Sequence, residues 1–442
     1  MYKYLLFLFI LANKNTNSIK LVKRQLFLKD VFVIALSAYG GPNMHMALYQ
    51  KRLVEEKQYL TSDELLEYYS LCQMLPGPSS TQTLMSIGYK FGGAMLAFLT
   101  LLVWVSPAFI LLTLCAIFIG AFQDKALDYL RFVQPTAVGF VIVAGVKMFK
   151  KSVKNRQGYL LASMAFLVTA LLRHPLDNVL NVKTPWMFPI VLIIAGLFSF
   201  FDFKGKVQAY EPIKVKFPWK SLVAFITVFI LAGVLGRISS NPIILLFENN
   251  YRFGTIVFGG GNVLIPMMLE QFTNHIPLGA LVPVMTAEQF INGVGLVQAI
   301  PGPIFTIASF TGATAMQGYG VLQQVLGSFV STIGIFLPGA FLIFFVFPIW
   351  KKIKKHPIVV KALPGVIAAS SGLVLAAAYL MLLPVGFEWI EEGSFFYTNL
   401  DLTAPVHYLQ LMIIGLTSVL LFTTKIKSPW YIAIAILIGV LV

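Results

Sequence analysis

Long apolar segments, separated by short polar ones, run along almost the whole chain. Most reach or approach the length of about 20 residues that an α-helix needs to cross a bilayer, and Gly or Pro interrupts several of them. The pattern predicts an all-α polytopic membrane protein. The expected apolar cores are Leu26–Gly41, Ser80–Leu99, Thr100–Phe122, Leu130–Phe149, Tyr159–Leu172, Trp186–Phe203, Trp219–Leu235, Pro242–Phe258, Ile304–Met316, Val321–Trp350, Val359–Leu383, Tyr408–Phe422 and Trp430–Val442.

Two stretches between these cores, Asn43–Leu75 and Val263–Ile300, mix charged and apolar residues at helical spacing. Segments of this kind lie at the membrane interface, re-enter the membrane or line a wet cavity. We leave these alternatives open and expect about 13 membrane segments, including re-entrant pieces.

The composition agrees with a membrane protein. Of the 442 residues 58% are hydrophobic and only 12% are charged, and the mean hydropathy is +0.81. A soluble domain carries about 25% charged residues, so a soluble enzyme and a disordered chain are both excluded. Two cysteines are too few for a disulfide scaffold, and we expect Cys72 and Cys115 to be small core residues.

The net charge of +15 would suggest a nucleic-acid partner in a soluble protein. Here Lys and Arg gather in short loops between apolar runs, where they orient the chain in the cytoplasmic (inner or plasma) membrane, and no nucleic-acid partner is expected. The loops Arg173–Lys183 and Glu391–His407 are poorer in positive charge and fit the outside. The basic, and therefore cytoplasmic, segments are Lys14–Lys29, Lys147–Arg156, Lys204–Lys220, Lys351–Lys361 and Lys425–Lys427.

The second half of the chain repeats four landmarks of the first half in the same order. We therefore divide the chain into an N-terminal extension (1–20), a first repeat (21–204), a linker with an inverting membrane helix (205–240) and a second repeat (241–442). The paired landmarks are Tyr39-Gly40-Gly41-Pro42-Asn43 with Phe258-Gly259-Gly260-Gly261-Asn262, Cys72-Gln73-Met74-Leu75-Pro76-Gly77-Pro78 with Val297-Gln298-Ala299-Ile300-Pro301-Gly302-Pro303, Ser106-Pro107-Ala108-Phe109 with Pro338-Gly339-Ala340-Phe341, and Gln134-Pro135 with Leu363-Pro364.

Charge predicts that the two repeats are inverted. Leu130–Phe149 ends in a basic loop, whereas its counterpart Val359–Leu383 begins after one. If basic loops are cytoplasmic, these two segments cross in opposite directions. Inverted repeats with Gly/Pro-interrupted segments at matching positions are typical of secondary transporters. The pattern favours a transporter or channel without naming its cargo.

The two Pro-Gly-Pro triplets must break any helix that contains them, because proline removes a backbone donor and clashes with the preceding turn. Pro78 and Pro303 suit the first turn of a new helix. Such a helix directs unpaired N–H groups and partial positive charge into the break, which favours anions. The glycine runs could add further N–H groups. The alternative is that each triplet is only an interfacial turn. The backbone candidates are Gly40, Gly41, Pro42, Pro76, Gly77, Pro78, Gly260, Gly261, Asn262, Pro301, Gly302 and Pro303.

Polar side chains near the breaks are further candidates. Gln73 and Gln298 precede the triplets, and Gln82 and Thr306 follow them, so each could donate to an oxyanion or simply cap a helix. Ser79, Ser80 and Thr81 have the same two interpretations.

Two ionisable side chains complete the candidate set. Lys90 lies in an apolar run and could be a counter-charge to an anion or could extend to the interface. His45 could carry a coupling proton or only pack, and Asn262, near its counterpart, cannot titrate.

Signatures of enzymes are missing from the sequence. It contains no HExxH, Walker A or GxSxG motif and no Cys/His cluster at metal spacing. We therefore expect no enzyme activity, no cofactor, no metal site and no ATP-driven transport by this chain.

These motifs resemble the chromate ion transporter family in its long-chain, two-domain form, from about Gln25 to Val442. Tyr59 stands where that family usually has Trp, Asn262 where a His is expected, and the Met1–Lys20 extension has no counterpart. The first-repeat residues that carry the resemblance are Gly40-Gly41-Pro42, His45, Val54-Glu55, Tyr59-Leu60, Cys72-Gln73, Leu75-Pro76-Gly77-Pro78 and Gln82, and those of the second are Phe258-Gly259-Gly260-Gly261, Pro266, Gln298, Pro301-Gly302-Pro303-Ile304-Phe305-Thr306 and Gly312.

The resemblance implies secondary active efflux of chromate, with sulfate as a competing tetrahedral oxyanion, and hence chromate resistance. The anion would lie between the two breaks, held by backbone N–H groups with Gln and Lys90 assisting. A passive anion channel, a transporter of another anion, and a membrane scaffold or sensor are the alternatives. A homodimer is left open; the expected partners are the small inorganic anion and the lipid bilayer.

Overall fold

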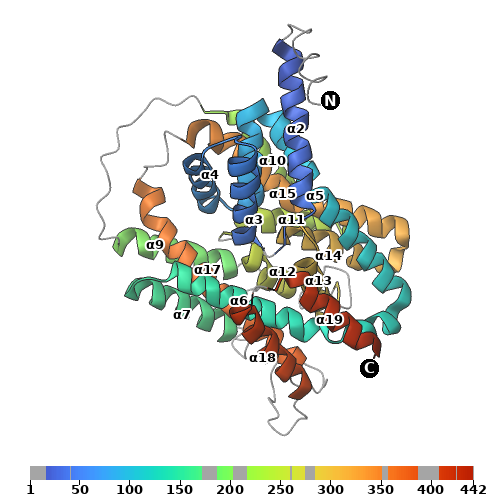
Figure 1. Cartoon of the computed structure of the whole chain (residues 1–442). Helices are drawn as coiled ribbons and strands as arrows, with labels where there is room; N and C mark the ends of the chain where they lie inside the picture. The colour runs from blue at the N-terminus through green and yellow to red at the C-terminus, as the bar shows by residue number, and fades with distance from the viewer. Residues whose placement is uncertain are drawn as a thin grey trace.

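The computed structural model describes residues 16–39, 41–171, 187–202, 217–258, 261–273, 284–350, 357–386, 408–424 and 426–441, and within them the chain is helical (Figure 1). The elements of the first half are α2 (Thr16–Ala35), α3 (Pro42–Tyr49), the π-helix η1 (Gln50–Glu56), α4 (Ser62–Met74), α5 (Ser79–Leu130), α6 (Val133–Ser152), α7 (Arg156–Leu171), α9 (Met187–Asp202) and α10 (Trp219–Ile238). Those of the second half are α11 (Pro242–Ile256), η3 (Gly261–Val263), α12 (Leu264–Thr273), α13 (Ala287–Ala299), η4 (Ile304–Thr306), α14 (Ile307–Ala315), η5 (Gln317–Tyr319), α15 (Val321–Val346), η6 (Phe347–Ile349), α17 (Pro357–Gly386), α18 (Tyr408–Thr423) and α19 (Ser428–Leu441).

The predicted class is confirmed: this is an all-helical, multi-pass membrane protein. Among the described residues, five helical stretches are long and apolar enough to cross a bilayer, and shorter apolar helices accompany them. The total of 13 membrane segments stays a prediction. The five stretches are Ser79–Phe122, Val133–Lys150, Trp219–Ile238, Val321–Ile349 and Pro364–Leu383.

The long helix α5 folds back on itself, so one predicted boundary is wrong. The expected break between Leu99 and Thr100 lies instead at Gly93, whose φ of 70° is open to glycine but strained for other residues. The indole Nε1 of Trp104 donates to Thr81 Oγ1 over 3.0 Å, which places the two arms side by side. The first arm of α5 is therefore only about 14 residues long, too short to cross a membrane alone.

α4 and this first arm of α5 form a helical hairpin with Gly77 at its tip. Glu64 near the start of α4 bonds Lys90 near the end of the arm at 2.6 Å, so the two open ends of the hairpin are adjacent. Thr61 and Glu64 form a capping box that starts α4. Of the alternatives for Asn43–Leu75, this geometry favours a re-entrant segment.

α13 and α14 form a second hairpin of the same design, with Gly302 at its tip. A Cβ atom added to Gly293 of α13 would meet the ring of Phe310 of α14, which shows the two arms in contact. Thr286 and Gln289 form the matching capping box. Gly320, with φ of 92°, precedes the next long helix α15. Gly93 has the corresponding position in the first half, where it precedes the second arm of α5. For the described part of the second amphipathic stretch, this geometry likewise favours a re-entrant segment.

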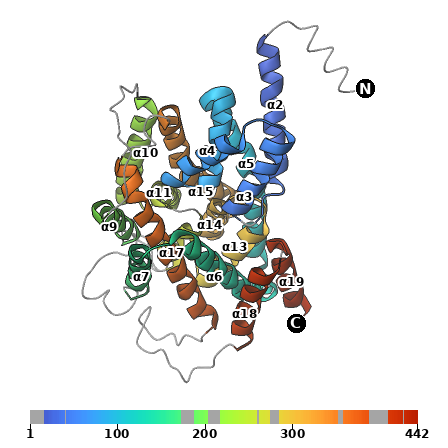
Figure 2. The same ribbon diagram turned by 60° about the vertical axis from the view of Figure 1, so that its left-hand side comes forward.

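The remaining long helices pack through small residues. α17 crosses α6, α7 and α9, and α11 crosses α15 (Figure 2). At Gly372 of α17 the backbone of α7 approaches so closely that a Cβ atom would collide with the Ala162 carbonyl oxygen. Close backbone approach at small residues is the usual way in which helices pack within a bilayer.

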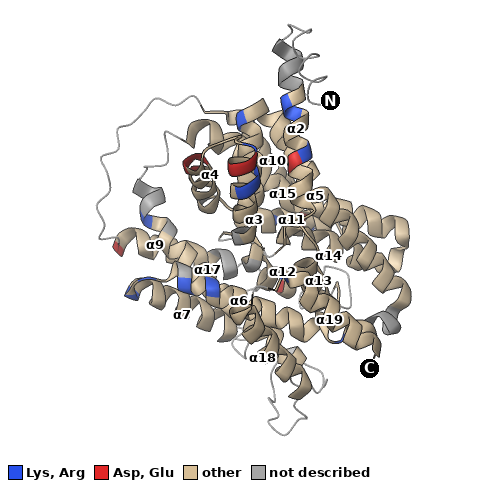
Figure 3. Ribbon diagram, in the orientation of Figure 1, with Lys and Arg blue, Asp and Glu red and all other residues tan. Residues whose placement is uncertain are grey.

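Among the described residues, many charged positions lie near helix ends (Figure 3), and the buried charged side chains are Asp30, Arg252 and Glu270. Lys147 near the end of α6 donates to the Leu421 carbonyl near the end of α18 over 3.3 Å. Ser199 near the end of α9 donates to the Lys361 carbonyl near the start of α17 over 2.8 Å. These contacts pair helix ends whose basic loops were predicted to share one side.

Replacing Gly372 with Ala is expected to lower the free energy of unfolding by about 1–3 kcal/mol, because the new Cβ atom overpacks the α7–α17 crossing. Gly233→Ala on α10 is the control, since no atom lies within 4 Å of its added Cβ, and we expect it to be neutral or slightly stabilising. Thermal unfolding in detergent measures both; equal melting temperatures would contradict the close crossing.

Candidate functional site

The tip of each hairpin donates a hydrogen bond to a residue in the other half of the chain. The N–H group of Gly77 donates to the Val257 carbonyl over 2.7 Å, and the N–H group of Gly302 donates to the Ala38 carbonyl over 2.9 Å. Val257 and Ala38 each lie just before the glycine run of their own half. The Pro-Gly-Pro breaks and the glycine runs therefore meet in one place.

The glycines at the tips are required by backbone conformation, and Gly302 is required by space as well. Gly77 has φ of 110° and Gly302 has φ of 143°, both unfavourable for residues with a side chain. The Cβ that Gly77 lacks would lie 3.6 Å from the Gly339 Cα in α15, and that of Gly302 would lie 2.6 Å from the Ala108 Cβ in α5. Ala108 and Gly339 each follow a proline inside a long helix, so this contact is also reciprocal.

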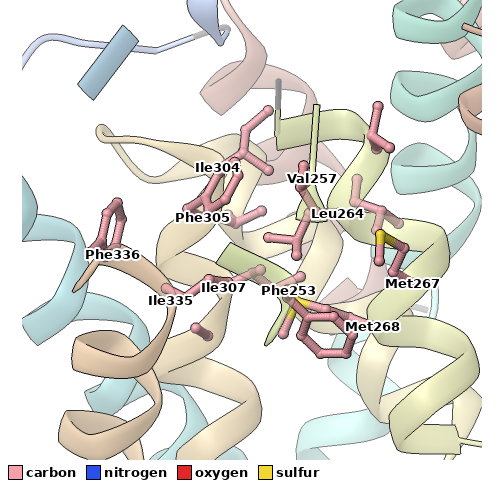
Figure 4. Close-up of a cluster of buried hydrophobic side chains, with 14 of the residues drawn as sticks. Phe253, Val257, Leu264, Met267, Met268, Ile304, Phe305, Ile307, Ile335 and Phe336 are labelled. Atoms are coloured by element: carbon pink, nitrogen blue, oxygen red, sulfur yellow. The ribbon is translucent and has the colours of Figure 1, made fainter. Parts of the chain in front are cut away.

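Ile304 occupies the centre of this junction. Its side chain lies 3.6 Å from the position of an added Cβ on Gly41 and 2.7 Å from that on Gly261, so both glycine runs approach it. Ile304 and Phe305 belong to a buried apolar cluster with Val257, Leu264 and further side chains of α11, α12 and α15 (Figure 4). The second break is therefore lined by apolar side chains.

The first break is lined by polar side chains instead. α5 begins with Ser79-Ser80-Thr81-Gln82-Thr83, and all five side chains are buried. The first amides of a helix have no acceptor within the helix, and they carry its partial positive charge. A polar, buried helix N-terminus of this kind has the chemistry that favours an anion.

Two side chains of α3 form hydrogen bonds with the first turn of α5. His45 of α3 faces Ser80 with Nδ1···Oγ at 3.0 Å, and its Nε2 lies 3.3 Å from the Ala38 carbonyl. Tyr49 donates its hydroxyl to the Ser80 carbonyl over 3.3 Å. Both ring nitrogens of His45 thus have partners suited to a neutral imidazole that donates to Ala38 and accepts from Ser80. This arrangement favours the packing role of His45 over the proton-carrier role.

Ser79 is the polar side chain of this turn whose hydroxyl remains available. It is 6% exposed, and its Oγ makes no hydrogen bond with any residue that the structure describes. Ser79 follows Pro78 at the point where the break becomes helix. The sequence could identify it only through its position after the Pro-Gly-Pro triplet.

The other predicted polar side chains lie beside the breaks, and two of them bond to the backbone of their own triplet. Gln82 donates Nε2 to the Pro76 carbonyl over 2.8 Å, and its buried Oε1 has no partner among the described residues. Thr306 donates its hydroxyl to the Pro303 carbonyl over 2.6 Å, a local bond to the backbone of the break, and it does not cap the helix that follows. Gln298 is buried and Gln73 half-buried on the last turns of α13 and α4.

The second proline of each Pro-Gly-Pro triplet lies one residue before the first helical turn in which it was predicted. Pro303 is the N-cap residue of η4 rather than part of its first turn, and Pro78 likewise precedes α5 and accepts from the Gln82 N–H over 2.9 Å. Pro301 is buried and Pro76 half-buried. Each break therefore ends at its second proline.

Lys90 is not brought to the breaks. It lies at the opposite end of the first arm of α5, bonded to Glu64, with about a third of its side chain exposed. This position favours the interfacial alternative over a counter-charge beside the anion.

Part of the predicted set cannot be placed. Gly40 and Gly260 lie outside the described residues, and of Pro42 and Asn262 only the backbone is described. Pro42 begins α3 directly after Gly41, whose φ is 78°. The loops 173–183 and 391–407 and residues 1–15 of the predicted N-terminal extension also lie outside the described residues.

A charged network near the first hairpin was missed from sequence. Asp30 of α2 is only 5% exposed, and its carboxylate accepts from Arg52 over 2.8 Å and from the Tyr59 hydroxyl over 2.8 Å. Burial, and then the hydrogen bond to Asp30, raise the pKa of Tyr59 well above its usual value, so Tyr59 stays a neutral donor. An acid inside the apolar run Leu26–Gly41 was the available signal.

Two helical hairpins of the same design, whose tips meet inside a multi-pass helical protein, are typical of membrane transporters and channels. The chain belongs to the chromate transporter family: the family model "Chromate transporter" matches residues 25–201 and 244–440. The resemblance predicted from sequence is thereby confirmed, and the protein is a transporter rather than an enzyme.

Curated relatives are similar over most of their length. An uncharacterized transporter of Methanocaldococcus jannaschii is 23% identical over 396 residues, which cover 88% of this chain and 91% of the relative. The chromate transport protein of Pseudomonas aeruginosa is 24% identical over 321 residues (69% and 68%), and that of Cupriavidus metallidurans is 22% identical over 357 residues (78% and 79%). No solved structure matches the chain.

Asp30→Asn is expected to lower the free energy of unfolding by about 2 kcal/mol, because it weakens charge-assisted hydrogen bonds at a buried carboxylate. Glu56→Gln is the matched control, since Glu56 bonds the same Arg52 but is exposed; its expected cost is below about 1 kcal/mol. Chemical unfolding in detergent measures both, and equal effects would show that Asp30 does not fix α2.

Proposed function

We propose that this protein is a secondary transporter that exports chromate, or a similar tetrahedral oxyanion such as sulfate, across the cytoplasmic membrane. The observation that carries the proposal is the buried polar first turn of α5, at the place where the two hairpin tips meet. Membership of the chromate transporter family and two relatives named chromate transport proteins support chromate as the first candidate cargo.

We place the anion at the N-terminus of α5, bound by the amides of its first turn and by the Ser79 hydroxyl. The partial positive charge of a helix N-terminus compensates a negative ligand in a medium that water does not screen. The apolar second break, with Ile304 and Phe305, would form the dry wall opposite. The site that we propose is therefore asymmetric, although the scaffold around it is repeated.

We also propose that the two repeats are inverted in the membrane and rock against one another to expose the site alternately. Lys147 contacts the Leu421 carbonyl, so the basic ends of α6 and α18 lie on the same side of the molecule. This arrangement supports the proposed orientation. The two matching segments of the family model support the duplication. Movement of one repeat would act on the bonds from Gly77 and Gly302, since these cross between the repeats.

Liposomes that contain the purified chain are expected to take up radiolabelled chromate to saturation under an imposed ion gradient, with sulfate competing. Ser79→Ala should raise the KM for chromate about tenfold or more, because it removes a hydrogen bond to a charged ligand. Ser70→Ala, exposed on α4, and Lys90→Gln, at the hairpin's open end, should change it by less than about twofold.

Each contrary result has a distinct meaning in this assay. Flux that never exceeds equilibrium would indicate a passive channel, and no saturable chromate or sulfate flux under any gradient would end the proposal. Equal KM values for Ser79→Ala and Ser70→Ala would show that the anion does not bind at the N-terminus of α5.

Inversion predicts that the open ends of the two hairpins face opposite sides of the membrane. In a chain whose native Cys72 and Cys115 are replaced by Ser, a membrane-impermeant maleimide should label Tyr319→Cys in intact cells but label Asp63→Cys only after permeabilisation. Asp63 begins the first hairpin and Tyr319 follows the second, and both are exposed. Labelling of both sites in intact cells would show that the hairpins open on the same side.

A further inference from the structure

A cavity of about 580 Å³ lies between α6, α7 and α17, away from the hairpin tips. Its walls are almost entirely apolar and include Phe149, Phe166, Leu375 and Leu382. This volume is within the range of about 300–1,000 Å³ that is usual for ligand pockets. An apolar surface cannot replace the hydration of the anion proposed above, so this cavity fits a different kind of ligand.

The cavity is reached from the lipid-facing side of α7. Ser163 and Leu167, which line it, are exposed, and their neighbours Leu160 and Met164 on the outer surface of α7 are 50% and 51% exposed. In a bilayer, such an opening faces acyl chains rather than water. An occupant with a long apolar chain therefore enters without crossing a polar layer.

One end of the cavity adjoins a concentration of positive charge. Phe149 lies within the segment Lys147–Arg156, which carries five basic residues and no acidic one. The ring of Phe149 packs on that of Tyr159 with centroids 5.6 Å apart, which brings the end of α6 against the start of α7. Figure 3 shows Lys and Arg gathered at this end of α6 and α7.

Several donors in this region lack a protein partner. Lys154 and Arg156 are exposed and form no ion pair with any residue that the structure describes. The Nε2 of Gln157 is buried and has no hydrogen-bond partner among the described residues. These three residues do not line the cavity, but they lie in the chain between Phe149 and Ala162, which do. Unpaired cations and a buried amide donor in this position match a ligand that joins an anionic group to a hydrocarbon chain.

We propose that this cavity binds an anionic phospholipid, with one acyl chain between α6, α7 and α17 and the phosphate against Lys154, Arg156 and Gln157. Basic pockets between membrane helices hold anionic headgroups through charge, and each basic side chain near the membrane surface contributes about 1 kcal/mol. The concave apolar wall adds burial of the chain, which a flat helix surface cannot supply. The site does not depend on the proposed anion transport.

Native mass spectrometry of the detergent-purified chain, titrated with phosphatidylglycerol or phosphatidylcholine, tests the site. We expect phosphatidylglycerol to bind at least tenfold more tightly. Replacing Lys154 and Arg156 together with Gln should weaken its binding by about 25-fold, at about fivefold for each charge. Lys220→Gln, an exposed basic residue at the start of α10, is the charge control and should bind as the unmodified chain does.

A second pair of variants tests the acyl-chain cavity. Ser163→Trp fills the cavity and should abolish specific binding of phosphatidylglycerol, whereas Met164→Trp, one residue away on the outer surface of α7, should leave it unchanged. Melting temperatures establish that both variants fold. Equal binding by the two Trp variants, or equal binding of phosphatidylcholine and phosphatidylglycerol, would overturn the proposal.

Discussion

The hydrogen bonds from Gly77 to Val257 and from Gly302 to Ala38 hold the centre of this protein together. A chain that breaks its helices inside a membrane exposes backbone donors and acceptors that lipid cannot satisfy. Each half of this protein supplies a carbonyl acceptor to the hairpin tip of the other half. The backbone of neither tip is therefore satisfied by its own half alone. The absence of a side chain at the tips is part of the same constraint, because Ala108 lies where a Cβ atom of Gly302 would be and the φ of 110° at Gly77 disfavours any other residue.

Within this repeated scaffold the two breaks differ in chemistry. The helix after the first break starts with buried Ser and Thr side chains, and its Ser80 is held by His45 and Tyr49. The corresponding turn after the second break contains Ile304 and Phe305 and belongs to an apolar cluster. A helix N-terminus surrounded by hydroxyl groups stabilises an anion, whereas one covered by aliphatic carbon cannot replace the anion's hydration. Under the function that we propose, duplication provides the common frame and divergence of one turn provides the anion site.

Much of the fold could be predicted from sequence because membrane segments are encoded locally, by length and apolar content. The re-entrant arms were among the alternatives for Asn43–Leu75 and Val263–Ile300, and the family resemblance was confirmed by the family model. The turn at Gly93 was not predicted, although Lys90 and the pair Gly92-Gly93 interrupt the apolar run there. The site was predicted less completely. Lys90 was a candidate because of its unusual position in sequence, but the hairpin places it beside Glu64. Asp30 was overlooked because its partners, Arg52 and Tyr59, are distant in the chain.

The sequence by itself determined that this protein is helical, lies in a membrane, contains a repeated set of breaks and belongs to a family of anion transporters. These properties follow from composition, from proline and glycine chemistry and from the order of short motifs, none of which needs a partner from elsewhere in the chain. Only the tertiary structure decided which donors at the breaks are already used, as at Gly77 and Gly302, and which are left, as at Ser79. The reason is that hydrogen bonds are exclusive: a donor is available to a ligand only if no other segment of the fold has bonded it, and that depends on the whole chain.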